Sequence, residues 1–153
     1  MPKRPKQDSQ NIEVAFIGGS GLYEINDLLD PEERDVETPY GHPSSSLSVG
    51  TLENRRVAFR ARHGRFHQYL PTEIPNRANI YALKKLGVER IVSISAVESL
   101  DESILPLSIV VPDQLIDRTK NRDGTFFGDG IVAHISFADP YCPSLSRSLI
   151  EAC

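Results

Sequence analysis

The chain has no apolar run close to the roughly 18 residues that a membrane-spanning helix requires. Its N-terminal segment, MPKRPKQDSQ, contains basic side chains, but no apolar stretch follows them as it would in a signal peptide. These two absences predict a soluble cytoplasmic protein that is neither exported nor bound to a membrane.

Cysteine is scarce, and the pattern of a disulfide framework or a zinc site is missing. Cys142 and Cys153 are the two cysteines of the chain, and no CxxC spacing relates them. Without a secretory context, both are expected to be reduced thiols in the cytoplasm. Neither stands beside a base in the sequence, so no thiol nucleophile is predicted.

The sequence also lacks a continuous stripe of basic residues. It has 17 Lys and Arg against 21 Asp and Glu, a net charge of −4, and the basic residues are scattered. This distribution argues against nucleic acid as a partner and predicts that any bound anion is small. A chain of 153 residues has the length of a single domain or of a piece of a larger one.

Residues 1–12 are predicted to be a disordered tail, and residues 13–153 to belong to one domain. The basic residues of the tail stand among prolines and polar side chains, which favours a solvated segment over a nuclear address. No internal repeat divides the rest of the chain.

The pattern of apolar residues predicts an α/β fold. Strands are expected at 13–17, at 47–52 and 55–60 around a Glu53-Asn54 turn, and at 90–96, with another apolar run at 108–111. A helix is expected between Pro75 and its stop at Gly87, and another over 143–153 with Ser144 as its N-cap.

Three features point to an anion at the ends of these strands. The glycine-rich turn at 18–21 can direct backbone N–H groups and the Ser20 hydroxyl inward. Arg62 and His63 follow the strand at 55–60, and Ser95 ends the strand at 90–96. Arg62 offers a planar fork that suits phosphate or carboxylate. Taken singly, the same residues are explained by a plain tight turn, a surface ion pair and a packed imidazole.

A metal site is not predicted. His63 and His67 are four residues apart, but Gly64 and Pro71 disfavour a helix between them, and no third ligand is near in sequence. The glycine turn is not a dinucleotide fingerprint either, because Glu24 stands where its third glycine belongs.

Together, six ordered motifs resemble the 5′-methylthioadenosine phosphorylase branch of the trimeric purine nucleoside phosphorylases. The motifs are IGGSGL at 17–22, TPYG at 38–41, RHG at 62–64, the stretch from Pro71 to Leu83 that contains RANI, DQLIDRT at 113–119 and FFGDG at 126–130. The match as a whole runs from about Val14 to the last residue, so the resemblance covers nearly the whole sequence.

The resemblance implies a mixed central sheet flanked by helices. It further implies a cytoplasmic pentosyltransferase of purine or methionine salvage that uses phosphate to cleave a purine nucleoside, with 5′-methylthioadenosine as the foremost candidate. The products are the free base and a ribose 1-phosphate, and phosphate is a co-substrate beside which no cofactor or metal is expected.

The matching positions imply a phosphate site with catalytic residues Arg62 and His63. Ser20, Ser95 and the backbone of Ala96 complete that site by resemblance. His134 matches a histidine that reaches the nucleoside pocket of a neighbouring subunit, which implies a trimer.

Three departures from the family pattern bear on function. Glu98 replaces a glycine close to the phosphate site, Pro106-Leu107-Ser108 replaces Pro-Gly-Asp, and the C-terminal half that binds the purine in the family has no counterpart. The hypotheses are therefore the N-terminal part of a phosphorylase whose other half lies elsewhere, a catalytically dead relative that binds or assembles, and a phosphate-binding module.

Overall fold

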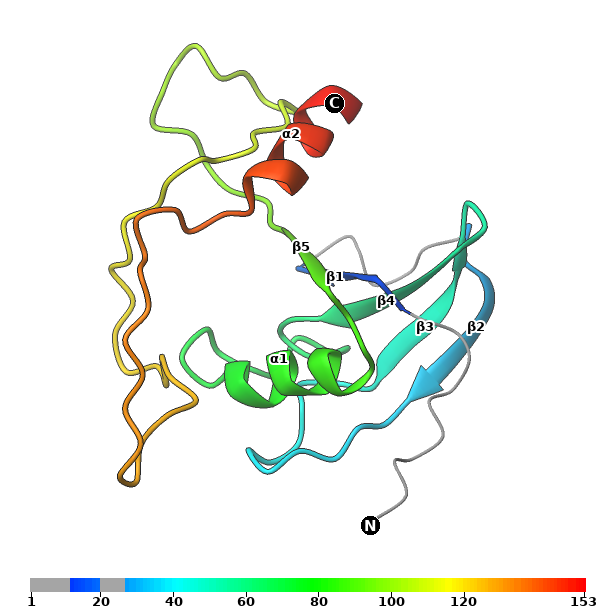
Figure 1. The fold of residues 1–153 in the computed structure, drawn as a ribbon. Helices are drawn as coiled ribbons and strands as arrows, with labels where there is room; N and C mark the ends of the chain where they lie inside the picture. The colour runs from blue at the N-terminus through cyan, green and yellow to red at the C-terminus, as the bar shows by residue number, and fades with distance from the viewer. Residues whose placement is uncertain (1–11, 20–26) are drawn as a thin grey trace. The chain divides into compact units, whose positions relative to one another are not determined.

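The computed structural model describes residues 12–19 and 27–153. In this part of the chain the elements are β1 (Val14–Gly18), β2 (Leu29–Arg34), β3 (Leu47–Leu52), β4 (Arg55–Ala61), α1 (Asn76–Lys85), β5 (Arg90–Ile94) and α2 (Pro143–Ala152) (Figure 1). The described residues up to Ala96, together with 122–124, form one compact unit. Residues 97–121 and 125–153 form a second.

The first unit contains a mixed five-stranded sheet with the order β2-β3-β4-β1-β5. β1 pairs in parallel with both β4 and β5, whereas β2, β3 and β4 pair antiparallel. The predicted mixed α/β sheet is thus confirmed. In the hairpin between β3 and β4, Glu53 and Asn54 have φ of +47° and +61°, which is the backbone of a tight type I′ turn.

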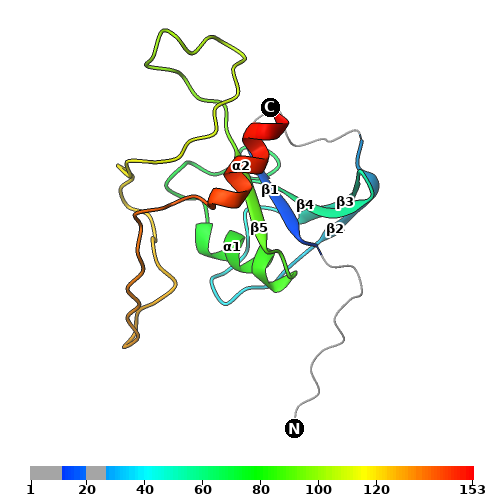
Figure 2. The ribbon, with the colours of Figure 1, turned by 45° about the horizontal axis from the view of Figure 1, so that its top comes forward.

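The core of this unit lies between the sheet and α1 (Figure 2). Small residues contribute to this core, since Ala15 and Ala58 on the sheet and Ala82 on the helix have no exposed surface. The cluster also contains Ile12, Leu47, Val49, Leu83 and Val88. Helix α1 ends as predicted, because Gly87 takes a φ of +87° that other residues rarely adopt.

Strand β2 was not predicted from the sequence. It is an edge strand of sequence LDPEER, mostly exposed, with Pro31 at a position where an edge tolerates a missing N–H. Its register against β3 shifts between Leu29 and Glu32. Charged residues, a proline and an irregular register protect an edge from pairing with other chains, and they also hide a strand from pattern analysis.

The second unit contains α2 and extended segments. None of residues 97–153, all of which the structure describes, is buried. The apolar run at 108–111 forms no strand, and Ile109 is 74% exposed, because no described strand pairs with it. The N-cap of α2 is Cys142, with Pro143 in the first turn, so the prediction of Ser144 as the cap was wrong. Proline is preorganised for the first helical position.

A buried amide joins α1 to the sheet. The side-chain oxygen of Asn79 accepts hydrogen bonds from the Ser44 backbone N–H at 2.8 Å and from Nη1 of Arg60 at 2.8 Å, and the Ser44 hydroxyl oxygen lies 3.2 Å from it. The Ser44 hydroxyl also lies 2.8 Å from the carbonyl of Ala61, to which it can donate. The residues that end β4 are therefore held by contacts from two other segments.

We expect Asn79→Ala to lower the free energy of unfolding by about 3 kcal/mol, because it leaves the Ser44 N–H and Arg60 without their acceptor. Urea unfolding followed by circular dichroism measures the change. Asn76→Ala is the matched control in the same helix, where the side chain is only half-buried, and it should cost less than about 0.5 kcal/mol. Equal losses in the two variants would show that the buried hydrogen bonds are not what matters.

Candidate functional site

The candidate site lies at the carboxyl edge of the sheet, where β1, β4 and β5 end side by side. Parallel pairing aligns Gly18 with Ala61 and with Ile94, so all three strands stop at the same level. Two hydrogen bonds extend the pairing past the strand ends, from Arg62 N to Gly18 O at 2.9 Å and from Gly19 N to Ile94 O at 3.4 Å. Ligands of open α/β sheets bind outside this edge.

Arg62 connects the three strand ends. Its Nη1 donates to the hydroxyl oxygen of Ser95 at 2.7 Å. Its Nη2 lies 3.4 Å from where a Cβ on Gly19 would stand, so the absence of a side chain lets the backbone of Gly19 lie close to the guanidinium. Among the described residues Nη2 has no hydrogen-bond partner. The fork can therefore accept an anion beside Ser95.

His63 is held by the loop that follows β4. Its Nδ1 lies 3.1 Å from the carbonyl oxygen of Tyr69, and the Tyr69 N–H donates to the His63 carbonyl at 3.2 Å. A carbonyl can only accept, so Nδ1 carries the proton in this bond. Nε2 is then the acceptor for Nε of Arg62, at 3.4 Å. His63 can donate from Nε2 to an anion only as the imidazolium.

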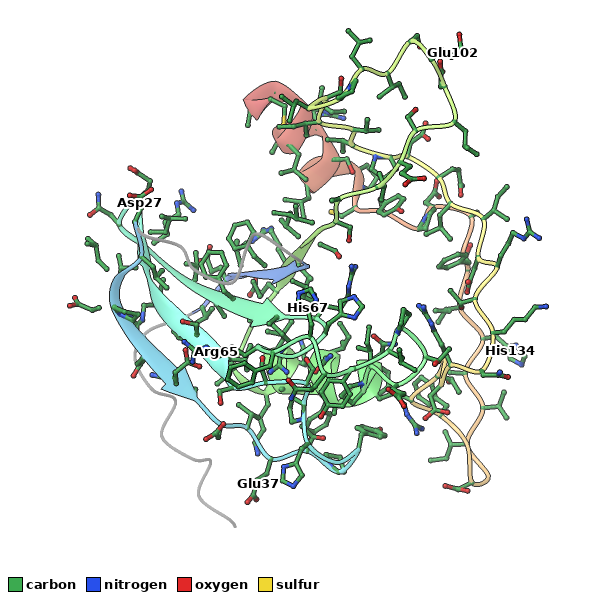
Figure 3. All side chains as sticks on the ribbon, turned by 180° about the vertical axis from the view of Figure 1, so that it is seen from behind. Asp27, Glu37, Arg65, His67, Glu102 and His134 are labelled. Atoms are coloured by element: carbon green, nitrogen blue, oxygen red, sulfur yellow. The ribbon has the colours of Figure 1, made fainter. Side chains whose placement is uncertain are left out.

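The loop itself depends on two left-handed residues. Gly64 is buried with a φ of +79°, and a Cβ there would lie 2.7 Å from the side chain of Gln68. His67 has a φ of +53°, and its ring stacks on that of His63 with centroids 5.8 Å apart. Figure 3 shows Arg65 and His67 on this loop beyond the end of β4. These contacts orient the imidazole of His63.

Arg60 is a charged residue near the site that sequence reasoning missed. It is 3% exposed, and burial lowers the pKa of its guanidinium from its usual value to about 10. The signal was present in the sequence, because alternation along β4 puts Arg60 on the same face as the core residue Ala58. Charged residues are rarely fully buried, so a charged residue at a core position of a strand indicates a special role.

The structure brings together some of the predicted site residues. Arg62, His63 and Ser95 form one hydrogen-bonded group, and Ala96 follows Ser95 directly. Ser20 lies outside the described residues. His134 lies exposed in the second unit (Figure 3). Binding roles for all six residues remain predictions.

A hollow of about 280 Å³ lies elsewhere in the first unit, beside the hairpin. It is lined by residues of the sheet and its loops: Glu33, Ser44, Ser45, Ser46, Ser48, Phe59, Arg60, Ala61, Arg65, Phe66 and Gln68. None of the predicted site residues lines it. The convergence of strand ends, and not this hollow, marks the candidate site.

Among the described residues, no helix is long and apolar enough to cross a membrane. This result agrees with the absence of long apolar runs from the sequence.

Comparison with known proteins gives consistent results along nearly the whole chain. Residues 13–153 match the model of the family described as the Phosphorylase superfamily. The S-methyl-5'-thioadenosine phosphorylase of Thermosynechococcus vestitus is 59% identical over 139 residues, which are 91% of this chain and 48% of that protein. The protein of the same name from Hyperthermus butylicus is 51% identical over 99% of this chain and 55% of its own length.

Solved structures resemble the fold equally well. A methylthioadenosine phosphorylase from an antarctic soil metagenomic library superposes with a TM-score of 0.89 at 54% identity, over 94% of this chain and 50% of that one. The methylthioadenosine phosphorylase of Schistosoma mansoni, in complex with tubercidin, gives a TM-score of 0.86 at 37% identity, over 93% and 52%. The chain thus spans about half the length of the relatives it matches.

We expect Arg62→Lys to weaken phosphate binding at least about tenfold, because an ammonium cannot bind two phosphate oxygens in the plane of a fork. Isothermal titration of the chain with phosphate measures the dissociation constant. Arg65→Lys is the matched control, since Arg65 is an exposed arginine of the same loop, and its dissociation constant should not change. An unchanged constant for Arg62→Lys would place the anion elsewhere.

Proposed function

The chain belongs to the phosphorylase superfamily, and we propose that it supplies the phosphate-binding part of a purine nucleoside phosphorylase. The proposed reaction is phosphorolysis of 5′-methylthioadenosine to adenine and 5-methylthioribose 1-phosphate. Such a pentosyltransferase would serve purine or methionine salvage, and we propose the cytoplasm as its location. The names of the relatives support this choice of substrate.

One observation carries the proposal: the guanidinium of Arg62 lies between Ser95 and Gly19 at the common end of three parallel strands. This arrangement offers a charged fork beside a hydroxyl, at the edge where such sheets bind ligands. The same edge is the one that the resemblance to phosphorylases assigns to phosphate.

The chemistry requires an oriented anion more than a protein nucleophile. Cleavage of the glycosidic bond leaves positive charge on the sugar and negative charge on the departing base. A phosphate held by Arg62 stabilises the sugar cation, attacks the anomeric carbon and takes over the bond to the sugar, while the base leaves with the bonding electrons. His63, as the imidazolium, and Ser95 would donate to the same phosphate. No resident cofactor or metal takes part in this scheme.

The proposal includes further partners. The apolar residues of 97–153 are widely exposed, with Val97 at 83% and Ile116 at 89%. We propose that they pack against the half of the phosphorylase fold that this sequence does not span. A trimer in which His134 reaches a neighbouring nucleoside pocket follows from the resemblance.

A second candidate function, assembly or anion binding without catalysis, is favoured by Glu98. Its carboxylate stands three residues after Ser95, where it would repel phosphate. A protein of this kind would bind phosphate weakly and still associate with other phosphorylase chains.

The decisive assay follows adenine release from methylthioadenosine and phosphate. We expect none from the chain alone. Release is expected when the chain is co-expressed with the part of the Thermosynechococcus vestitus protein that it does not match, because that half supplies the purine site. Arg62→Ala in the same pair should lower the rate by at least about 100-fold. Co-purification of the two polypeptides without adenine release would favour the second candidate function.

Glu98→Gly tests the effect of the carboxylate. We expect phosphate to bind about threefold more tightly at low salt, because one exposed like charge is removed from the vicinity of the ligand. Glu102→Gly, which removes an exposed carboxylate four residues further on, is the control and should have a smaller effect. No change in either variant would mean that Glu98 does not face the anion.

A further inference from the structure

The buried guanidinium of Arg60 lacks the partners that such a group usually has. Its Nη1 donates to the Asn79 side chain at 2.8 Å, but Nε and Nη2 are buried and have no hydrogen-bond partner within residues 12–19 and 27–153. Among the described residues no carboxylate forms an ion pair with it. A neutral amide is therefore its one partner in this part of the chain.

A buried charge without an ionic partner destabilises the folded protein. Its presence therefore suggests a function other than packing. Burial disfavours the charged form, yet a pKa of about 10 leaves Arg60 protonated at neutral pH. Replacing a buried charge by an apolar side chain of similar volume is often neutral or stabilising. The position is therefore better suited to methionine or leucine if packing alone matters.

The charge lies close to the anion site. Arg60 precedes Arg62 by two residues, about 6.6 Å along a strand. Its partner Asn79 lies in the first turn of α1, the turn reached directly from the Arg62 loop. Ser44 bonds both Asn79 and the carbonyl of Ala61, which ties the cation to the end of β4.

Although Arg60 lines part of the hollow beside the hairpin, its unpartnered nitrogens Nε and Nη2 have almost no accessible surface, so a ligand cannot bond to them in this arrangement. A direct bond from these nitrogens to a ligand is therefore excluded. The electric field of the Arg60 charge still acts on a ligand, since charges in a low-dielectric interior act over longer distances than charges in water.

We propose that Arg60 is a remote cation of the anion site: its buried positive charge strengthens the binding of a dianion at Arg62 and Ser95 through its electric field. This inference rests on the proposed function. The interaction energy of a field with a ligand scales with the charge of that ligand, whereas loss of a rigid scaffold weakens all ligands of one shape alike.

Sulfate and methanesulfonate provide the test. Both present a tetrahedral group to the site, but sulfate carries two negative charges and methanesulfonate carries one. Titrations of the full chain at about 10 mM salt, where the Debye length is about 30 Å, keep the field unscreened. At a charge separation on the order of 10 Å, Arg60→Met should weaken sulfate about tenfold and methanesulfonate about threefold. Its thermal unfolding midpoint without ligand should stay the same or rise.

Three further variants separate charge from structure. Arg60→Lys keeps the charge and should restore most of the sulfate affinity. Arg60→Gln keeps a donor for Asn79 without the charge, so it should lose sulfate affinity as Arg60→Met does, and it replaces that variant if methionine does not fold. Arg56→Met removes an arginine of the same strand and face whose charge is already paired with Glu32, and it should leave both affinities unchanged.

The inference fails if the neutral variants bind sulfate as the wild type does, if they lose both anions by the same factor, or if lysine does not restore binding. A wild-type chain that binds neither anion would instead overturn the proposed phosphate site, and this inference with it. Wild-type binding with unaffected Arg60 variants would leave the phosphate site intact and remove only the role of Arg60.

Discussion

The parallel pairing of β1 with both β4 and β5 is the constraint on which the site depends. Parallel neighbours end at the same edge, so residues far apart in the sequence meet there. Arg62, Gly19 and Ser95 are brought together in this way. The hydrogen bonds from Arg62 N and Gly19 N then continue the ladder one step beyond the strands and fix the backbone that presents the guanidinium.

The buried hydrogen bonds of Asn79 support the same edge of the sheet. The amide oxygen of Asn79 accepts hydrogen bonds from Ser44 and from Arg60. The Ser44 hydroxyl lies within hydrogen-bond distance of the carbonyl oxygen of Ala61, the residue before Arg62. Stability and function are coupled at this point, because the group that joins helix to sheet also holds an uncompensated cation. Polar groups in a core are costly when unsatisfied, so their concentration here, beside a proposed anion site, is consistent with a functional demand.

The regular elements with strong patterns were predictable, and those without them were not. Local chemistry predicts three of these elements: the apolar run EVAFI predicts a strand, the residues at Glu53-Asn54 predict a turn, and the helical spacing before Gly87 predicts a helix and its end. Strand β2 carries none of these signals, because its pairing with β3 forms the strand and its own sequence has no strand pattern. Ser144 as a helix cap failed for a local reason, because the proline before it already begins the helix. The apolar run at 108–111 shows the opposite case: its residues are apolar, but the run forms no strand, and none of residues 97–153 is buried.

The sequence by itself determined the chemical groups of the candidate site and their places at strand ends, because a glycine turn, an arginine fork and a hydroxyl are properties of residues and of their order. It also determined the family, since six motifs stand in order along the chain. Tertiary structure alone decided that the Arg62 fork bonds Ser95 and that Arg60 is buried, since both facts depend on which strands are neighbours and on which face each side chain lies. Distance in space and burial arise from pairing between segments, and one-dimensional patterns record neither.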